Sequence, residues 1–436
     1  MSPRKGSGKK KKSSKAELSA LATADEVQVV AANNITSEKE KKKQNFIVRT
    51  IWTVVMIAGF FIILGAGHFW VISLISVILI LTYKEVIRLA HDPSREKALP
   101  FSKALTWYFL ASTLYFLYGE RVIFSFKEVF LVDRILRPLA THHRFISFML
   151  YVIGFMFFVS SLQNQHYKFQ FTQFAFIHVT LLLVVVQGHF IMSNIFNGMF
   201  WVFFPCSLVI INDIFAYLCG ITFGKTPLIK ISPKKTVEGF LGAWISTIVI
   251  GTGLSYLLIK WPYMICPVTD FKATVLTGME CVPNPIFTKQ AYKLPQFLIG
   301  LFGTTSSSFE IEPVYLHVVV LASFASLIAP FGGFFASGLK RTFQIKDFGD
   351  TIPGHGGITD RMDCQFLMGF FTYIYYDSFI STHNVLFATV LETAIQSMTV
   401  AEQFELVAEL HNHLFQNGYI KNGTEECLDK VRAVWK

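Results

Sequence analysis

Residues 240–259 read FLGAWISTIVIGTGLSYLLI, an unbroken run of 20 residues without one charged side chain. An α-helix rises about 1.5 Å per residue, so a run of this length matches the roughly 30 Å hydrocarbon core of a bilayer. The run therefore predicts a membrane-spanning helix. Residues 174–191 form a second apolar run of nearly the same length.

The composition of the whole chain agrees with this prediction. Hydrophobic residues make up 52% of the 436 residues and charged residues only 16%, which is typical of an integral membrane protein and excludes an ordinary soluble domain. The sequence therefore predicts an all-α, polytopic membrane protein with about nine transmembrane helices. Several runs are shorter than 20 residues, so their ends and their number are approximate. The remaining apolar runs cover 51–64, 69–83, 104–118, 145–162, 198–211, 315–335 and 366–380.

Polar segments divide the chain into four regions. Residues 1–46 are basic and lack an apolar stretch, so we expect a disordered cytosolic tail and no secretory signal peptide. Such a tail either binds anionic lipid headgroups or only keeps the protein soluble. We expect N-terminal transmembrane helices in 47–200 and a catalytic transmembrane region in 201–382. A C-terminal appendage of amphipathic helices is expected in 383–436.

The positive-inside rule orients these segments. With the tail in the cytosol, the polar segments 212–238 and 336–365 both fall on the cytosolic face, and loop 260–314 falls in the lumen. Cys266 and Cys281 lie in that loop, and they form a disulfide if the compartment is oxidising. The basic loop 119–144 falls on the outer side, against the rule. Its segment FKEVFLVDRILRPL, 126–139, is alternatively an interfacial amphipathic helix.

The first polar segment contains residue types suited to phosphate. Asp213 directly follows the apolar run that ends at residue 211, and SPKKTVEG occupies 232–239. We expect a turn at Ser232 and Pro233, then Lys234 and Lys235, then a helix that begins near Thr236 or Glu238. One interpretation is a basic loop with an ordinary helix cap. The other is an anion site, because free N–H groups and the helix dipole favour phosphate beside two lysines.

The second polar segment, 337–363, reads SGLKRTFQIKDFGDTIPGHGGITDRMD. Its basic side chains Lys340, Arg341 and Lys346 suit a polyphosphate. The glycines of PGHGG let backbone N–H groups approach a phosphate closely.

The end of this segment gives a more specific indication of a ligand. Asp360 and Asp363 are spaced i, i+3, which places both carboxylates on one face of a helix. Magnesium usually takes one or two carboxylates together with substrate phosphates, so this pair suits a magnesium site. The alternative is a helix cap with a salt bridge to Arg361.

Together these motifs resemble the signature of a known family. Ser337-x-x-Lys340-Arg341, Lys346-Asp347, HGG at 355–357 and DRMD at 360–363 are similar to the signature of phosphatidate cytidylyltransferases, also called CDP-diacylglycerol synthases. DIFAYLCGITFGK, 213–225, and SPKKTVEG resemble further conserved stretches. The likeness covers about 46–380, and the layout is that of the eukaryotic endoplasmic-reticulum form.

The resemblance implies a reaction in which CTP and phosphatidic acid give CDP-diacylglycerol and pyrophosphate, in the endoplasmic reticulum membrane, at a site that faces the cytosol. We identify no nucleophile with an adjacent base, so the lipid phosphate itself would attack the α-phosphorus of CTP. We assign magnesium to Asp360 and Asp363, with Asp347 and Asp213 as further ligands or supporting partners.

The remaining site residues are assigned to substrate. We expect the phosphates to contact Lys234, Lys235, Ser337, Lys340, Arg341, Lys346, Gly356, Gly357 and Arg361, and count Lys346 with Asp347, Asp360, Asp363 and His355 as catalytic. His355 either orients a phosphate and protonates departing pyrophosphate, or makes only a structural hydrogen bond.

The expected partners are CTP, phosphatidic acid and membrane lipids, with a second copy of the chain as a candidate and no nucleic acid. Two other functions compete. A CTP-dependent polyprenol or lipid kinase would share the metal but transfer the γ-phosphate to an alcohol. A membrane transporter would place isolated charges within its spans, and charges are nearly absent from these runs.

Overall fold

The computed structural model describes residues 43–44, 46–90, 99, 101–125, 136–268, 273–293, 308–381, 394–395 and 397–417. The chain divides into two compact units, Met1–Phe379 and Ile380–Lys436. Most of the predicted tail 1–46 and residues 126–135 of the predicted interfacial helix lie outside the described residues.

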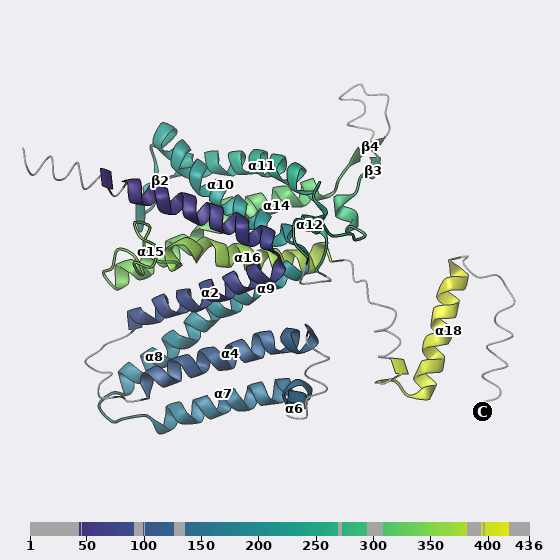
Figure 1. Cartoon of the computed structure of the whole chain (residues 1–436), viewed down its shortest axis with the longest axis horizontal. Helices are drawn as coiled ribbons and strands as arrows, with labels where there is room; N and C mark the ends of the chain where they lie inside the picture. The colour runs from purple at the N-terminus through teal and green to yellow at the C-terminus, as the bar shows by residue number, and fades with distance from the viewer. Residues whose placement is uncertain are drawn as a thin grey trace, which may run out of the picture. The chain divides into compact units, whose positions relative to one another are not determined.

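The described residues are mostly helical, as predicted (Figure 1). A first helical segment spans Phe46–Ala66. The α-helices that follow in the first unit are α2 (His68–Ile87), α4 (Ser102–Ser125), α6 (Leu136–Thr141), α7 (His143–Ser160), α8 (Tyr167–Thr180), α9 (Gln187–Phe196), α10 (Phe200–Phe223), α11 (Val237–Leu258), α12 (Pro262–Ile265), α14 (Val314–Leu327), α15 (Pro330–Thr342) and α16 (Thr359–Phe379). A π-helical segment, η2 (Leu181–Val186), joins α8 to α9, and short 3-10 helices are η1 (Arg88–Ala90) and η3 (Pro285–Phe287).

Seven helical segments in the described part of the chain are long and apolar enough to cross a membrane. The protein is therefore a multi-pass membrane protein, but the predicted count of nine is not confirmed. Helices α4 and α16 cover two further predicted runs and are long enough to span, yet they carry more polar residues. The seven segments are Phe46–Ala66, His68–Ala90, His143–Ser160, Tyr167–Phe196, Phe200–Phe223, Val237–Leu258 and Val314–Thr342.

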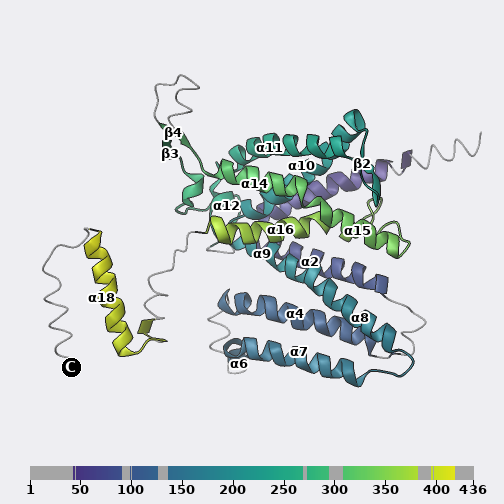
Figure 2. The same cartoon turned by 180° about the vertical axis from the view of Figure 1, so that it is seen from behind.

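Small residues let α11 approach its neighbours closely. Gly239, Ala243, Thr247, Gly251 and Ser255 are buried at every fourth position of α11, on the face that packs against α10 and α14 (Figures 1 and 2). A Cβ atom on Gly239 would lie 2.8 Å from the Ala216 carbonyl oxygen of α10. Spanning helices commonly associate through close backbone packing of this kind. A helix face gains little hydrophobic free energy by leaving lipid for another helix, so van der Waals contacts must stabilise the pair.

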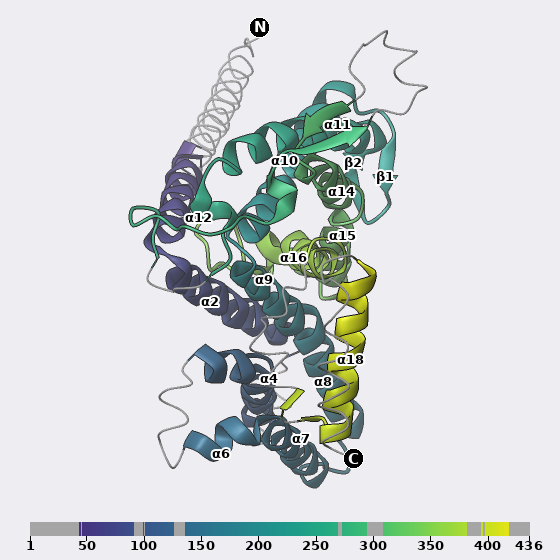
Figure 3. The same cartoon turned by 90° about the vertical axis from the view of Figure 1, so that its right-hand side faces the viewer.

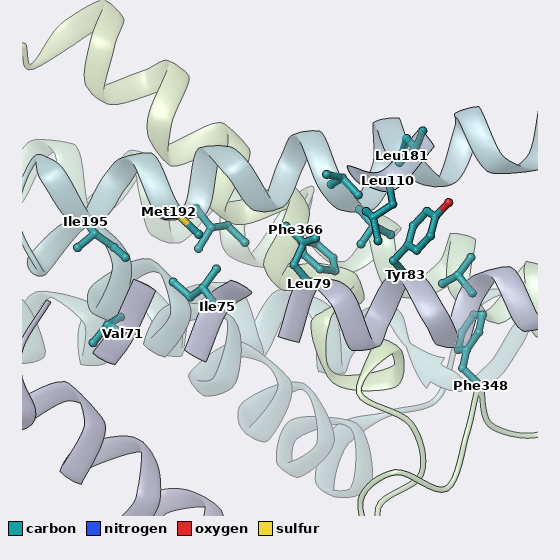
Figure 4. Close-up of a cluster of buried hydrophobic side chains, with 14 of the residues drawn as sticks. Val71, Ile75, Leu79, Tyr83, Leu110, Leu181, Met192, Ile195, Phe348 and Phe366 are labelled. Atoms are coloured by element: carbon teal, nitrogen blue, oxygen red, sulfur yellow. The ribbon is translucent and has the colours of Figure 1, made fainter. Parts of the chain in front are cut away.

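A row of buried apolar residues on α2 packs against α9 and forms the centre of a second part of the core. Val71, Ile75 and Leu79 of α2 face Met192 and Ile195 of α9 (Figure 4). Seen from the end, α2, α9 and α16 lie next to one another (Figure 3). The apolar cluster also includes Phe348, which belongs to the loop between α15 and α16. The core therefore fixes α2 beside the segment that carries the sequence motif.

The predicted turn at Ser232 and Pro233 is wrong. Strand β1 (Pro227–Ile229) pairs antiparallel with β2 (Ser232–Thr236), so the chain turns at residues 230–231 instead. Pro233 is tolerated because both strands of a two-stranded hairpin are edge strands. The predicted helix start is confirmed, because the Thr236 hydroxyl caps α11 by accepting from the Gly239 N–H at 3.2 Å.

The segment between α11 and α14 contains the remaining strands and a disulfide. Strand β3 (Gln290–Lys293) pairs antiparallel with β4 (Ser308–Ile311). Cys266 is bonded to Cys281, with the two Cα atoms 5.8 Å apart. The structure thus contains the disulfide that the sequence predicted only on condition of an oxidising compartment.

The second unit contains α18 (Val400–Gln416), a helix within the predicted C-terminal appendage. Thr399 and Glu402 form a capping box at its first turn: the Thr399 side chain accepts from the Glu402 N–H, and the Glu402 carboxylate accepts from the Thr399 N–H. The described part of this region thus contains one capped helix, and the extent of the appendage stays a prediction.

The close packing of α11 gives a stability prediction. We expect Gly239→Ala to lower the free energy of unfolding by about 1–3 kcal/mol, because the new methyl group must displace backbone atoms of α10. Gly253→Ala is the matched control on the same helix, since a Cβ atom there meets nothing within 4 Å. Thermal unfolding of the purified variants in detergent measures both effects. A Gly239→Ala protein as stable as Gly253→Ala would contradict the packing described here.

Candidate active site

The two polar segments meet at one site. Lys235 of β2 places its Nζ 4.9 Å from the centre of the Phe334 ring of α15. Asp213 of α10 is close enough to Lys235 and Arg361 for their charges to interact. These contacts join the segment around 212–238 to the one around 336–365, which the predicted topology allows.

Asp360 organises the loop between α15 and α16. The Lys340 ammonium donates to Asp360 Oδ1 at 2.6 Å, and the N–H groups of Phe348 and Gly357 donate to Oδ2 at 2.9 and 3.2 Å. The Asp360 side chain is only 8% exposed. Both of its oxygens therefore already have partners, and its salt bridge is to Lys340, not to Arg361 as in the alternative helix-cap interpretation.

Asp363 lies one turn further along α16 and has a different environment. Its Oδ1 accepts from the Cys364 N–H at 2.7 Å, and its charge interacts with those of Asp213 and Lys340. No basic side chain in the described part of the chain lies within ion-pair distance of Asp363 or Asp213. These two carboxylates therefore retain oxygens that a bound cation could use.

The position of Asp213 differs from the expectation. The sequence placed Asp213 just after a span, whereas α10 continues to Phe223, so Asp213 lies inside a candidate spanning helix. The apolar run ended at residue 211 only because Asn212 and Asp213 interrupt it. An ionisable residue within a spanning helix is usually functional, because burying a charge in the membrane is costly.

Glycines of the loop between α15 and α16 lie where another residue would be strained or crowded. Gly354 and Gly356 have positive φ angles of 75° and 84°, which favour glycine. Gly356 lies against Asp347, since a Cβ atom on Gly356 would be 3.2 Å from Asp347 Cγ. The Gly357 N–H donates to Asp360 and so is not offered to a phosphate in this conformation. A phosphate contact by this N–H group therefore stays a prediction.

His355 is held by the first helical segment. Its Nε2 lies 3.1 Å from the Thr53 hydroxyl, and its carbonyl oxygen accepts from the Arg361 guanidinium at 2.9 Å. Arg49 donates from Nε to the Gly354 carbonyl oxygen at 2.6 Å. The structure thus shows a structural hydrogen bond for His355, and a role toward phosphate stays a prediction. Sequence reasoning missed Arg49 and Thr53, although Arg49 is a lone charge beside the first apolar run.

The other predicted phosphate ligands differ in exposure and in their contacts. Arg341 and Lys346 are exposed, and Ser337 is partly buried near the end of α15. The side chain of Lys234 lies outside the described part of the structure. Lys340 is engaged with Asp360, and its Nζ also lies 5.5 Å from the centre of the Phe348 ring.

Glu85 of α2 is a buried carboxylate that the sequence reasoning missed. It is 3% exposed and accepts hydrogen bonds from Thr351, Ile358 and Thr359 of the loop and of the first turn of α16. The sequence did contain a signal, because Glu85 is a single acidic residue just after the second predicted apolar run. A glutamate is rarely buried unless it is paired, so its position indicated either exposure or a partner elsewhere in the chain.

A magnesium ion fits this donor set only with help from substrate. Among the described residues no three His, Cys, Asp or Glu side chains are grouped closely enough to hold a metal by themselves. Asp213 and Asp363 provide two neighbouring carboxylates, and magnesium typically completes such a pair with phosphate oxygens and water.

Comparison with known proteins decides the family. The sequence profile described as the cytidylyltransferase family matches residues 47–379. The chain belongs to this cytidylyltransferase family. The match includes every predicted site residue from Asp213 to Asp363.

Curated relatives of this cytidylyltransferase come from several kingdoms. A Schizosaccharomyces pombe relative is 53% identical over 378 residues, which cover 87% of this chain and 86% of the relative. The phosphatidate cytidylyltransferase of Saccharomyces cerevisiae is 47% identical over 413 residues, 95% of this chain and 90% of the relative. The human phosphatidate cytidylyltransferase 2 is 41% identical over 413 residues, 95% and 92% of the two chains.

The different environments of Asp360 and Asp363 give a prediction. We expect Asp363→Asn to lower kcat by about a thousandfold without unfolding the protein, because the amide would weaken cation binding beside Asp213. Steady-state turnover and thermal unfolding of the same preparation measure the two effects. Asp377→Asn, an exposed change near the other end of α16, is the control and should stay close to wild type. Near-normal turnover by a folded Asp363→Asn protein would remove Asp363 from the chemistry.

Proposed function

We propose that this cytidylyltransferase transfers the cytidylyl group of CTP to phosphatidic acid, giving CDP-diacylglycerol and pyrophosphate. The observation that carries the proposal is the Asp213–Asp363 pair, set in a spanning bundle and surrounded by Lys235, Lys340 and Arg361. This arrangement can gather the phosphates of a nucleotide and of a lipid at the membrane. The relatives named phosphatidate cytidylyltransferase support the same substrates.

In the proposed reaction an oxygen of the lipid phosphate attacks the α-phosphorus of CTP. A new P–O bond forms, the bond between the α-phosphorus and the bridging oxygen breaks, and pyrophosphate leaves with that electron pair. The attacking phosphate is already anionic at neutral pH, so no general base is needed. The task of the protein is then to position two anionic substrates and to offset their repulsion.

Basic side chains perform this task from both polar segments. Lys235 is positioned by β2 and Phe334, and Arg361 by its hydrogen bond to the His355 carbonyl oxygen. We assign both to the reacting phosphates. Exposed Arg341 and Lys346 are free to receive the remaining phosphates of CTP from the aqueous side.

We further propose magnesium as the cofactor, with Asp213 and Asp363 as its protein ligands. When bound, magnesium supplies positive charge to the phosphate oxygens. Asp360 would support this pair indirectly, since both of its oxygens have protein partners in the structure. A direct metal role for Asp360 or Asp347 stays a prediction, and so does the homodimer.

The location we propose is the endoplasmic reticulum membrane, with the site facing the cytosol. The Cys266–Cys281 disulfide follows α11, whose other end carries the site residues of β2. A disulfide is typical of an oxidising compartment, so the opposite end of α11 would face the reducing cytosol. This orientation also gives the site access to CTP.

Isotopic labelling separates this reaction from the lipid-kinase alternative. With purified protein, phosphatidic acid, magnesium and CTP labelled at the α-phosphate, we expect the label in the lipid product. Label at the γ-phosphate should leave as pyrophosphate, because attack at the α-phosphorus releases the two outer phosphates together. Thin-layer chromatography of both reactions shows the outcome. Transfer of γ-label to lipid, with CDP as the second product, would overturn the proposed function.

The orientation predicts which positions a membrane-impermeant maleimide reaches in sealed microsomes. Lys225→Cys and Lys346→Cys should be labelled without permeabilisation, since both positions are exposed at the proposed cytosolic face. Lys289→Cys, exposed in the segment between α11 and α14, should be labelled only after permeabilisation. Gel-shift detection against the unsubstituted protein controls for native cysteines. Labelling of positions 225 and 346 from opposite sides would contradict a single site.

A further inference from the structure

Glu85 links two parts of the chain that are far apart in sequence. It lies near the end of α2, and its hydrogen-bonding partners follow 266 to 274 residues later. The side chain is 3% exposed, so water cannot replace these partners. A carboxylate this deeply buried needs hydrogen-bond donors around it to remain stable.

Both oxygens of Glu85 accept hydrogen bonds. Oε1 accepts from the Thr351 hydroxyl and from the Ile358 N–H at 3.1 Å. Oε2 accepts from the Thr359 N–H at 2.9 Å and from the Thr359 hydroxyl at 2.7 Å. Because α16 begins at Thr359, Glu85 acts as a carboxylate cap that α2 supplies to the amino terminus of α16.

The loop is built to admit this carboxylate. A Cβ atom on Gly349 would lie 3.0 Å from Glu85 Oε1, and one on Gly357 would lie 2.7 Å from Oε2. Glycine at both positions therefore leaves the space that the Glu85 side chain occupies. The neighbouring N–H groups of Phe348 and Gly357 donate to Asp360 instead. Glu85 and Asp360 thus accept from different N–H groups of the same segment.

We propose that Glu85 is a positioning residue for cytidylyl transfer, which sets the placement of Asp363 through the first turn of α16. Asp363 follows Thr359 by four residues, about one helical turn, so a rotation of that first turn moves its carboxylate relative to Asp213. This inference rests on the proposed role of Asp363 in holding the cation.

The proposal depends on the acceptor character of Glu85 rather than on its size. Glutamine has nearly the same shape, but its NH2 group would face N–H or O–H donors of the loop at one of the two oxygen positions. Aspartate keeps two acceptor oxygens and is shorter by one methylene group. The two substitutions therefore separate the loss of an acceptor from a change in reach.

The test compares Glu85→Gln and Glu85→Asp with Lys84→Gln, an exposed change on the same helix that serves as the control. We expect Glu85→Gln to lower kcat about 10- to 100-fold. It should also raise the magnesium concentration that gives half of the magnesium-induced rise in melting temperature, measured with CTP present and phosphatidic acid absent. The KM for phosphatidic acid should change less than twofold, because Glu85 is 3% exposed and both of its oxygens are occupied by donors of the protein. Glu85→Asp should recover part of the kcat, and Lys84→Gln should match wild type.

A second pair of variants keeps the test decisive if Glu85→Gln does not fold. Thr359→Val removes the hydroxyl that donates to Oε2 but keeps the side-chain shape, whereas Thr359→Ser keeps the hydroxyl. We expect Thr359→Val to lower kcat about three- to tenfold with a matching shift in magnesium dependence, and Thr359→Ser to change neither.

Two results would overturn the proposal. One is a folded Glu85→Gln protein with kcat and magnesium dependence within twofold of wild type. The other is a Thr359→Val protein that loses activity only in proportion to its unfolded fraction, with unchanged magnesium dependence, which would make the contact structural. Failure of the proposed function is distinguishable, because it would appear as full activity in Asp363→Asn or as γ-label in the lipid.

Discussion

Carboxylates inside an apolar bundle must find partners, and this requirement organises the site. An unpaired carboxylate in a low-dielectric interior is costly, so the buried carboxylates of Glu85 and Asp360 are matched by donors. Asp360 pairs with Lys340 and two backbone N–H groups, and Glu85 is surrounded by donors from the loop and from Thr359. Asp213 and Asp363 have no such set of partners among the described residues. In this they differ from Asp360 and Glu85, whose hydrogen bonds hold the loop between α15 and α16.

The sequence predicted those parts of the structure that depend on local patterns. Long apolar runs located the spanning helices because hydropathy and length alone determine whether a helix fits a bilayer. The motif residues Lys340, Asp360 and Asp363 were correctly grouped because they lie within one short segment. The convergence of Asp213 and Lys235 with that segment followed from counting spans, since residues on the same membrane face can meet.

The parts that were missed depend on contacts over a long range. Glu85 accepts from two backbone N–H groups and two threonine hydroxyls that follow it by 266 to 274 residues, and no local sequence pattern links a residue to partners so far along the chain. Arg49 likewise binds a carbonyl oxygen more than 300 residues away. The end of α10 was misplaced for a different reason. A hydropathy run stops at the first polar residues, whereas a helix continues as long as its backbone hydrogen bonds form, and α10 continues to Phe223.

The depth of Asp213 has a consequence for how substrates arrive. Asp213 lies ten residues before the last residue of α10, a distance of about 15 Å along the helix axis. In the proposed reaction the acyl chains of the lipid stay in the leaflet, whereas the nucleotide and the pyrophosphate exchange with water. For such an enzyme the relevant concentration of one reactant is a surface density, in molecules per area of membrane. Dilution of that lipid within the bilayer, at constant bulk amount, would then slow the enzyme as effectively as withdrawing nucleotide.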